Sequence, residues 1–195
     1  AANANIKVFA TGGVGGVHLD AEKTFDVSAD LQELAQTPVT VISAGPKAIL
    51  DLPKTLQFLE TLGVPVITFG QDELPAFWSR SSGLRSPLRM NSAEEIARSQ
   101  LVREALSIPG GQLVANPIPA YAEIPFKEIL PIIEKAHLEA KKANISNKNL
   151  TPFLLEKIFH LTDGTSLEAN IELVKNNAFL ACKVASSLIT EKSKL

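Results

Sequence analysis

Short apolar segments of strand length recur along the first 115 residues, and stretches with a helical pattern separate them. The predicted strands are 6–10, 39–44, 64–69 and 111–115. The predicted helices between them are 31–35, 46–62 and 92–106. The segment 39–44 is almost continuously apolar, as expected of a parallel strand that helices cover on both faces. This alternation predicts an α/β fold with a mostly parallel sheet flanked by helices.

The remainder of the chain predicts a helical C-terminal part. Its expected helices are 125–143, 151–161 and 166–191. Some helix starts also have local signals: Asp30 and Ser92 are the expected N-caps of the first and third helices. Pro46 suits the first turn of the second helix, in which Pro53 predicts a kink or a break. We expect a single α/β domain over residues 1–195.

Composition narrows the class of protein. The chain has 195 residues, of which 45% are hydrophobic, and a formal net charge of −2. This apolar content excludes a disordered chain, and the even charge gives no basic surface for nucleic acid. No apolar stretch reaches the length of a membrane-spanning helix. The single cysteine, Cys182, excludes a disulfide framework, and its apolar helical surroundings predict a buried, inert thiol.

The two ends of the chain carry further signals. The sequence starts without methionine and reaches a strand-like segment by residue 6, so we expect processing or the downstream part of a longer protein. It closes on Ser193-Lys194-Leu195, which addresses proteins to peroxisomes when it stands at a free C-terminus. We therefore expect a peroxisomal protein, and otherwise a cytoplasmic one.

Ligands of open α/β sheets bind beyond the carboxyl ends of the strands, where four groups are expected to gather. These are the glycine-rich segment 11–18 with His18, Lys47, the long loop around Trp78, and Asn116. The glycine-rich segment lacks the G-x-G-x-x-G dinucleotide fingerprint, and the chain has no GK[ST] nucleotide motif. Its small residues let backbone N–H groups approach an anion, and a simple tight turn explains them equally well.

Lys47 is a candidate nucleophile. It follows Gly45-Pro46 at the end of a predicted strand and is expected in the first turn of a helix. The positive field of a helix N-terminus, together with burial, disfavours the charged ammonium. A neutral amine can form a Schiff base with a sugar aldehyde. The alternative is a solvated surface lysine, which is ordinarily the preferred interpretation; the position of Lys47 narrows that preference without reversing it.

Asp26, Ser28 and Asp30 form a D-x-S-x-D pattern that suits a hard divalent cation such as Mg²⁺ or Mn²⁺. The alternative is helix capping, which we expect for Ser28 or Asp30 but not for all three. No second histidine lies near His18 in the sequence, which argues against a zinc site. Asn170 is either an exposed polar residue or one that contacts a ligand.

Six segments, in order along the whole chain, resemble the pseudouridine-5′-phosphate glycosidase family, also described as indigoidine-synthase-A-like. They are FATGGVGGVH (9–18), TFDVSADL (24–31), AGPK (44–47), VANPIP (114–119), TPFLL (151–155) and SLEAN (166–170). The resemblance implies cleavage of the C–C glycosidic bond of pseudouridine 5′-phosphate to uracil and ribose 5-phosphate. It also implies a divalent metal, usually Mn²⁺, and a homotrimer. The closing Ser-Lys-Leu resembles the plant members, which act in peroxisomes.

The resemblance also implies roles for single residues. Lys47 matches the lysine that attaches to C1 of the ring-opened ribose as an iminium. Asp26 matches the metal ligand. The other matches line the substrate pocket, with Ala29 acting through its backbone and His18 near the phosphoribosyl group. These pocket residues are Ser28, Ala29, Asp30, Thr11, His18 and Asn170.

Two departures from the family pattern qualify this reading. Leu19-Asp20 stands where the family usually has Arg-Gly, which removes a basic contact. The family's general-acid glutamate and a phosphate-binding lysine lie upstream of the position that matches Ala1, so we expect these 195 residues to be catalytically incomplete. The competing interpretations are a phosphosugar or nucleoside kinase, whose D-T-x-G-A-G-D pattern is absent from the sequence, and a non-catalytic subunit.

Overall fold

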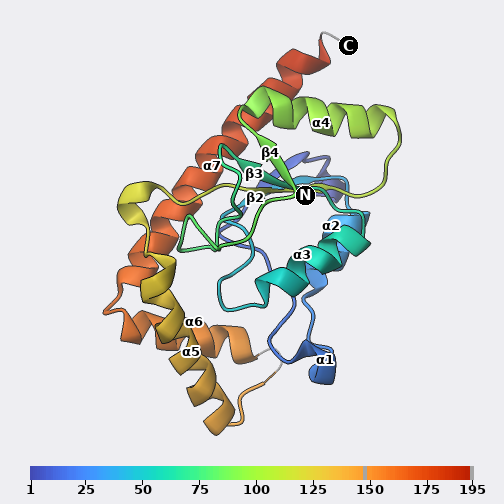
Figure 1. Cartoon of the computed structure of the whole chain (residues 1–195). Helices are drawn as coiled ribbons and strands as arrows, with labels where there is room; N and C mark the ends of the chain where they lie inside the picture. Colours follow the sequence, from blue (N-terminus) through green and yellow to red (C-terminus); the bar gives the residue numbers. More distant parts are fainter. Residues whose placement is uncertain (147–148, 194–195) are drawn as a thin grey trace.

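The computed structural model describes residues 1–146 and 149–193, and its centre is a five-stranded parallel sheet (Figure 1). The strands are β1 Val8–Ala10, β2 Thr40–Ser43, β3 Val66–Phe69, β4 Leu88–Met90 and β5 Gln112–Ala115. Their order across the sheet is β1-β2-β5-β3-β4. The prediction of an α/β fold with a mostly parallel sheet is therefore confirmed.

Helices surround this sheet and extend beyond it. They are α1 Ala21–Thr24, α2 Ala29–Gln36, α3 Leu52–Thr61, α4 Ala93–Ala105, α5 Phe126–Lys142, α6 Leu150–Leu161 and α7 Thr165–Lys192. Short 3₁₀ turns lie at Ala2–Ala4 and Ala120–Ala122. In Figure 1, α2 and α3 lie on the opposite side of the sheet from α4 and α7, and α5 and α6 form a separate lower part.

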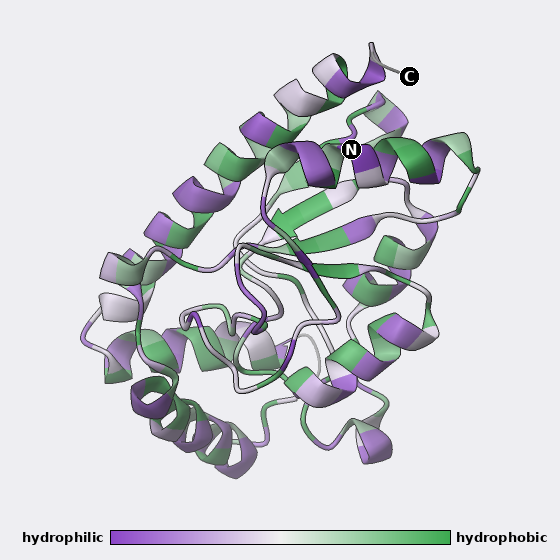
Figure 2. Cartoon of the chain, turned by 45° about the horizontal axis from the view of Figure 1, so that its top comes forward, coloured by the Kyte–Doolittle hydropathy of each residue, from purple (hydrophilic) through white to green (hydrophobic). Residues whose placement is uncertain are grey.

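The register of the strands explains this two-sided packing. Ile42 pairs with Val114, which pairs with Ile67, so these three side chains form one row across the sheet. That row packs against α4 and α7, while alternate residues such as Leu113 and Val66 pack against α2 and α3. Successive side chains of a strand point to opposite faces, so both faces are apolar and covered. Figure 2 shows the resulting hydrophobic strands between helices with one polar side.

A third apolar cluster joins the C-terminal helices to the long loop. Trp78 and Ile118 pack with residues of α5, α6 and the beginning of α7. The 28-residue helix α7 thus contacts this cluster at its start and the sheet further along. Within the described ranges, no helix is long and apolar enough to cross a membrane.

Several local predictions need correction. The strand β4 was not predicted, because it is a three-residue edge strand whose first two residues are exposed. Helix α3 begins at Leu52 rather than at Pro46, because Asp51 accepts a hydrogen bond from the Lys54 N–H and caps it. Pro53 therefore lies in the first turn, where its missing N–H costs nothing, and causes no kink.

Two side chains also differ from expectation. Ser28, not Asp30, caps α2, since its hydroxyl accepts from the Asp30 N–H. Cys182 is exposed rather than buried, because it lies on the side of α7 that faces away from the sheet cluster. Of the proposed targeting tripeptide, Lys194 and Leu195 lie outside the described residues.

Candidate active site

The glycine-rich segment 11–18, here called the glycine loop, contacts two other segments. These are residues 26–30, here called the acidic segment, and the turn that contains Lys47, here called the lysine segment. On one edge, Val17 forms an antiparallel bridge with Val27, and the His18 N–H donates to the carbonyl of Asp26 at 3.0 Å. On the other edge, the N–H of Lys47 donates to the carbonyl of Val14 at 3.1 Å. The loop therefore places residues 26–30 and Lys47 on its two sides.

Most of the loop's backbone donors are already used within the protein. The N–H groups of Val14, Gly15, Val17 and His18 donate to Gly45 O, Asp30 Oδ2, Thr55 Oγ1 and Asp26 O. These four groups cannot also hold an anion. The glycines instead permit close packing: a Cβ at Gly15 would lie 2.1 Å from Ser28 Oγ. Of the two explanations left open by the sequence, the tight packed turn fits these positions better.

The acidic segment divides its three polar side chains between structure and solvent. Ser28 caps α2, and Asp30 Oδ2 accepts the Gly15 N–H at 2.7 Å. The carboxylate of Asp26 has no such structural contact and lies 4.0 Å from Nδ1 of His18. Asp26 is thus the member of the pattern that remains available to a cation.

His18 contributes an unpartnered nitrogen beside that carboxylate. The residue is 8% exposed, and its Nδ1 is buried without a hydrogen-bond partner in the described part of the chain. A buried polar atom without a partner is costly, which favours a ligand or water there. Across the described ranges, however, no group of three or more His, Cys, Asp or Glu side chains is arranged to hold a metal.

Lys47 lies in a turn, and the prediction that it occupies the first turn of a helix is wrong. Helix α3 begins five residues later at Leu52. The side chain of Lys47 is half-buried between buried neighbours, and among the described residues Nζ has no hydrogen-bond or ion-pair partner. The turn is fixed from α5, where Nε2 of His137 lies 2.9 Å from the carbonyl oxygen of Ile49. The backbone of the turn that contains Lys47 is therefore fixed, while the Lys47 amine itself makes no hydrogen bond or ion pair with the described residues.

Helix α7 supports the glycine loop from the opposite direction. The fully buried Asn177 donates to the carbonyls of Thr11 and Gly12, at 2.9 and 3.2 Å, and accepts from Asn116 at 3.1 Å. About two turns earlier, Asn170 is half-buried and accepts a hydrogen bond from the indole of Trp78. Asn116, which we expected at the end of a strand, thus helps Asn177 to hold the glycine loop.

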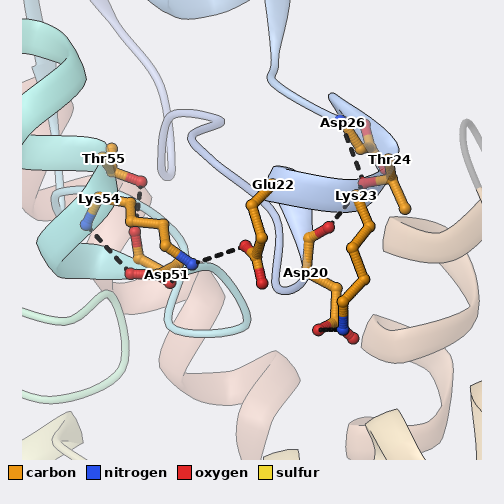
Figure 3. Close-up of polar contacts among 8 residues, drawn as sticks. All are labelled: Asp20, Glu22, Lys23, Thr24, Asp26, Asp51, Lys54 and Thr55. Atoms are coloured by element: carbon orange, nitrogen blue, oxygen red, sulfur yellow. Dashed lines mark hydrogen bonds and ion pairs between the residues drawn. The ribbon is translucent and has the colours of Figure 1, made fainter.

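An exposed ion-pair network connects α1 with the start of α3 (Figure 3). Lys54 pairs with Glu22 at 2.9 Å and with Asp51 at 3.0 Å. The hydrogen bond that Lys54 donates to Glu22 raises the pKa of Lys54, and the hydrogen bond that Lys23 donates to Asp20 lowers the pKa of Asp20. These solvent-exposed pairs tie α1 to the start of α3 and contribute little to stability.

A cavity of about 430 Å³ opens beside the glycine loop. Of the predicted site residues, Thr11 and Asp30 line it, together with apolar side chains of β1 and β2 such as Phe9 and Val41. Lys47 is not among its lining residues. The structure thus brings the acidic segment, the glycine loop and the lysine segment together without enclosing all of them in one cavity.

Comparison with known proteins identifies the family of this chain. Residues 1–187 match the family described as Indigoidine synthase A like protein. The chain belongs to this family. It is 63% identical over 187 residues to a pseudouridine-5′-phosphate glycosidase of Paracoccus denitrificans, covering 96% of this chain and 62% of that protein. It is 64% identical over 190 residues to that of a Jannaschia species, covering 97% and 63%. The chain therefore spans somewhat less than two thirds of these relatives.

Two solved structures have the same fold as this chain. The crystal structure of a prealnumycin C-glycosynthase in complex with ribulose 5-phosphate matches all of this chain and 64% of its own, with a TM-score of 0.93 and 30% identity. An indigoidine synthase A-like protein from Thermotoga maritima matches 94% of this chain and 60% of its own, with a TM-score of 0.85 and 38% identity. The resemblance seen in the sequence motifs is thereby confirmed.

In this indigoidine synthase A like chain, the departure at Leu19-Asp20 has a local explanation. Asp20 adopts a left-handed backbone conformation and pairs with Lys23 at 3.2 Å, so it turns toward α1. Leu19 is 47% exposed. Neither side chain is basic, so neither supplies the basic contact that the resemblance implies at this position.

Sequence reasoning missed the residues that hold the site segments in place, namely Thr55, His137 and Asn177. For Asn177 a signal existed. It follows Leu173 by four residues and precedes Leu180 by three, so it lies on the buried face of α7. A polar residue on an apolar helical face indicates a specific buried hydrogen bond.

Proposed function

We propose that this chain takes part in cleaving the C–C glycosidic bond of pseudouridine 5′-phosphate, giving uracil and ribose 5-phosphate. The names of relatives 55–64% identical to it support this substrate. The observation that carries the proposal is the pairing of the glycine loop with Lys47 on one edge and Asp26 on the other. This arrangement offers a nucleophile and a carboxylate on one rigid support.

Lys47 acts as the nucleophile in the proposed reaction. Its amine attacks C1 of the sugar, and the ring oxygen leaves with a proton, which opens the ribose. The nitrogen lone pair then forms the iminium while the C–C bond between C1 and uracil breaks. The electrons of that C–C bond pass to the uracil ring, which takes up a proton. Water adds to the iminium and releases ribose 5-phosphate. The half-buried amine without a protein partner suits an attacking group.

The residues around Asp26 fit a divalent cation, for which we propose Mn²⁺. The available Asp26 carboxylate and the unpartnered His18 Nδ1, 4.0 Å apart, would hold it, with water completing its shell. When bound, the cation supplies positive charge that orients the oxygen atoms of the sugar phosphate. Asp30 and Ser28 hold the loop and the helix α2 in place beside it.

Trapping the sugar tests the proposal. Incubating the chain with ribose 5-phosphate and borohydride should fix the reduced sugar to Lys47, as located by peptide mass mapping. Lys47→Arg should abolish the label, whereas Lys54→Arg, a matched change of a neighbouring lysine, should retain it. A wild-type chain that stays unlabelled, or is labelled equally without Lys47, contradicts the proposal. A kinase or a non-catalytic subunit would give no label.

The remaining features of the resemblance stay predictions. They are the homotrimer, the peroxisomal location and the precise roles of Thr11, Ala29 and Asn170 in the substrate pocket. Sizing of the purified protein checks the first, and a fluorescent fusion that preserves the C-terminal tripeptide checks the second.

A further inference from the structure

The buried side chain of Trp78 determines how Asn170 is oriented. Trp78 is 1% exposed, and its Nε1 lies 2.7 Å from Oδ1 of Asn170 and 3.1 Å from the carbonyl oxygen of Ser166. An indole N–H donates hydrogen bonds and cannot accept them. The end of the Asn170 amide that faces Trp78 must therefore be its carbonyl oxygen.

The other end of that amide is consequently a donor only. Nδ2 of Asn170 points away from the indole, and among the described residues it has no hydrogen-bond partner. An asparagine that rotates freely offers a ligand either a donor or an acceptor. The contact with Trp78 removes this choice, so the half-buried Asn170 presents two N–H groups.

The loop that carries Trp78 also reaches the turn of Lys47. The N–H of Phe77 donates to the carbonyl of Ala44 at 3.1 Å, three residues before Lys47. The rings of Phe77 and Trp78 pack edge to face, with centroids 4.9 Å apart. One short segment therefore hydrogen-bonds both to the backbone near Lys47, through Phe77, and to Asn170 on α7, through Trp78.

We propose that Trp78 is a specificity-determining positioning residue: it holds Asn170 so that the site accepts a leaving heterocycle with a ring carbonyl and rejects one with an amino group there. This inference rests on the proposed function. Uracil has carbonyl oxygens at C2 and C4, whereas cytosine has an amino group at C4 and isocytosine has one at C2. An amino group facing the Asn170 donors leaves both sides unpaired, which sites built on buried hydrogen bonds reject strongly.

Binding of the three free bases tests the inference. By isothermal titration, the wild-type chain should bind uracil about 10-fold more tightly than at least one of cytosine and isocytosine, the difference expected for one lost hydrogen bond. Trp78→Phe frees the amide to rotate and should bring that ratio close to one. Asn170→Asp keeps an oxygen toward Trp78 but offers only acceptors, so it should shift the preference toward the amino base.

The controls separate this inference from the proposed function. Tyr121→Phe also removes one aromatic donor to α7, the bond to Glu172, and should keep the wild-type ratio. Borohydride capture of ribose 5-phosphate at Lys47 should persist in Tyr121→Phe, while the base-binding ratios are compared in Trp78→Phe and Asn170→Asp. Loss of capture in the wild type refutes the proposed function. Capture with equal binding of all three bases, with no binding of any base, or with unchanged ratios in both variants, refutes the inference instead.

Discussion

The backbone N–H of Gly15 donates a 2.7 Å hydrogen bond to Oδ2 of Asp30. This bond connects the middle of the glycine loop to the first turn of α2, whose N-terminal field favours a carboxylate. Ser28 completes the junction through its N–H bond to Gly16 O. The loop and the acidic segment therefore form one rigid unit. Within the D-x-S-x-D pattern, only the Asp26 side chain makes no hydrogen bond that holds this unit together.

Gly15→Ala tests how tightly this unit is packed. The new Cβ would lie 2.1 Å from Oγ and 2.4 Å from Cβ of Ser28, which cannot move without breaking the cap of α2. We expect a loss of about 1–3 kcal/mol in the free energy of unfolding, measured with urea. Gly12→Ala, whose nearest contact is the flexible Val174 side chain at 3.3 Å, should cost less. Equal midpoints for the two variants would contradict this packing.

Asn177→Ala tests the support from α7. The substitution leaves the carbonyls of Thr11 and Gly12 and the amide of Asn116 without their buried partner. We expect a loss of about 2–4 kcal/mol in the free energy of unfolding and weaker capture of sugar by Lys47. Asn176→Ala, at the adjacent position, removes only the hydrogen bond to Pro117 O and serves as the control. If both variants unfold alike, Asn177 does not hold the loop.

The sheet and the long helices were predictable because their signals are local. The buried strands β2, β3 and β5 are short apolar runs, and α4 begins at its predicted cap Ser92. The start of α3 was mispredicted because Pro46 suits a helix start, yet in the fold it pairs with Val14 as an isolated bridge. That pairing forms across 32 residues, and no local pattern indicates it.

The candidate site was only partly predictable for the same reason. The motifs drew attention to Lys47 and to the acidic segment, whose roles stay predictions. The residues that fix these segments act over long sequence separations: Thr55 binds Val17 across 38 residues, and His137 binds Ile49 across 88. Such contacts depend on the tertiary fold rather than on local pattern.

His137 predicts a pH dependence of stability. Burial lowers the pKa of His137 from its ordinary value of 6.5, against the smaller opposing effect of the hydrogen bond to Ile49, and nearby His18 lowers it further. The unfolded chain therefore binds the proton more readily than the folded one. The stability that neutral His137 contributes is fully present above pH 6.5, and it is lost as the pH drops below that value toward the folded-state pKa.

Urea unfolding between pH 5 and 8 measures this effect. His137→Gln keeps an N–H donor for Ile49 but cannot titrate, so it should flatten the decline on the acidic side. His160→Gln, on the exposed side of α6, controls for the loss of a histidine elsewhere. A His137→Gln variant with the wild-type slope would show that another group causes the decline.

Manganese binding tests the availability of Asp26. The carboxylate lies 4.0 Å from the unpartnered His18 Nδ1, whereas the carboxylates of Asp30 and Asp20 are engaged with Gly15 and Lys23. Titration followed by electron paramagnetic resonance of free Mn²⁺ should show binding to the wild type. Asp26→Asn should weaken it at least about 10-fold, since it removes the negative charge that a hard cation prefers. Asp20→Asn changes an exposed carboxylate six residues away and should bind Mn²⁺ as the wild type does.

Chelation should lower the melting temperature of the wild type and leave that of Asp26→Asn unchanged, because a cation stabilises only a folded state that binds it. Equal Mn²⁺ affinity in Asp26→Asn and the wild type would place the cation elsewhere and remove Asp26 from the proposed site.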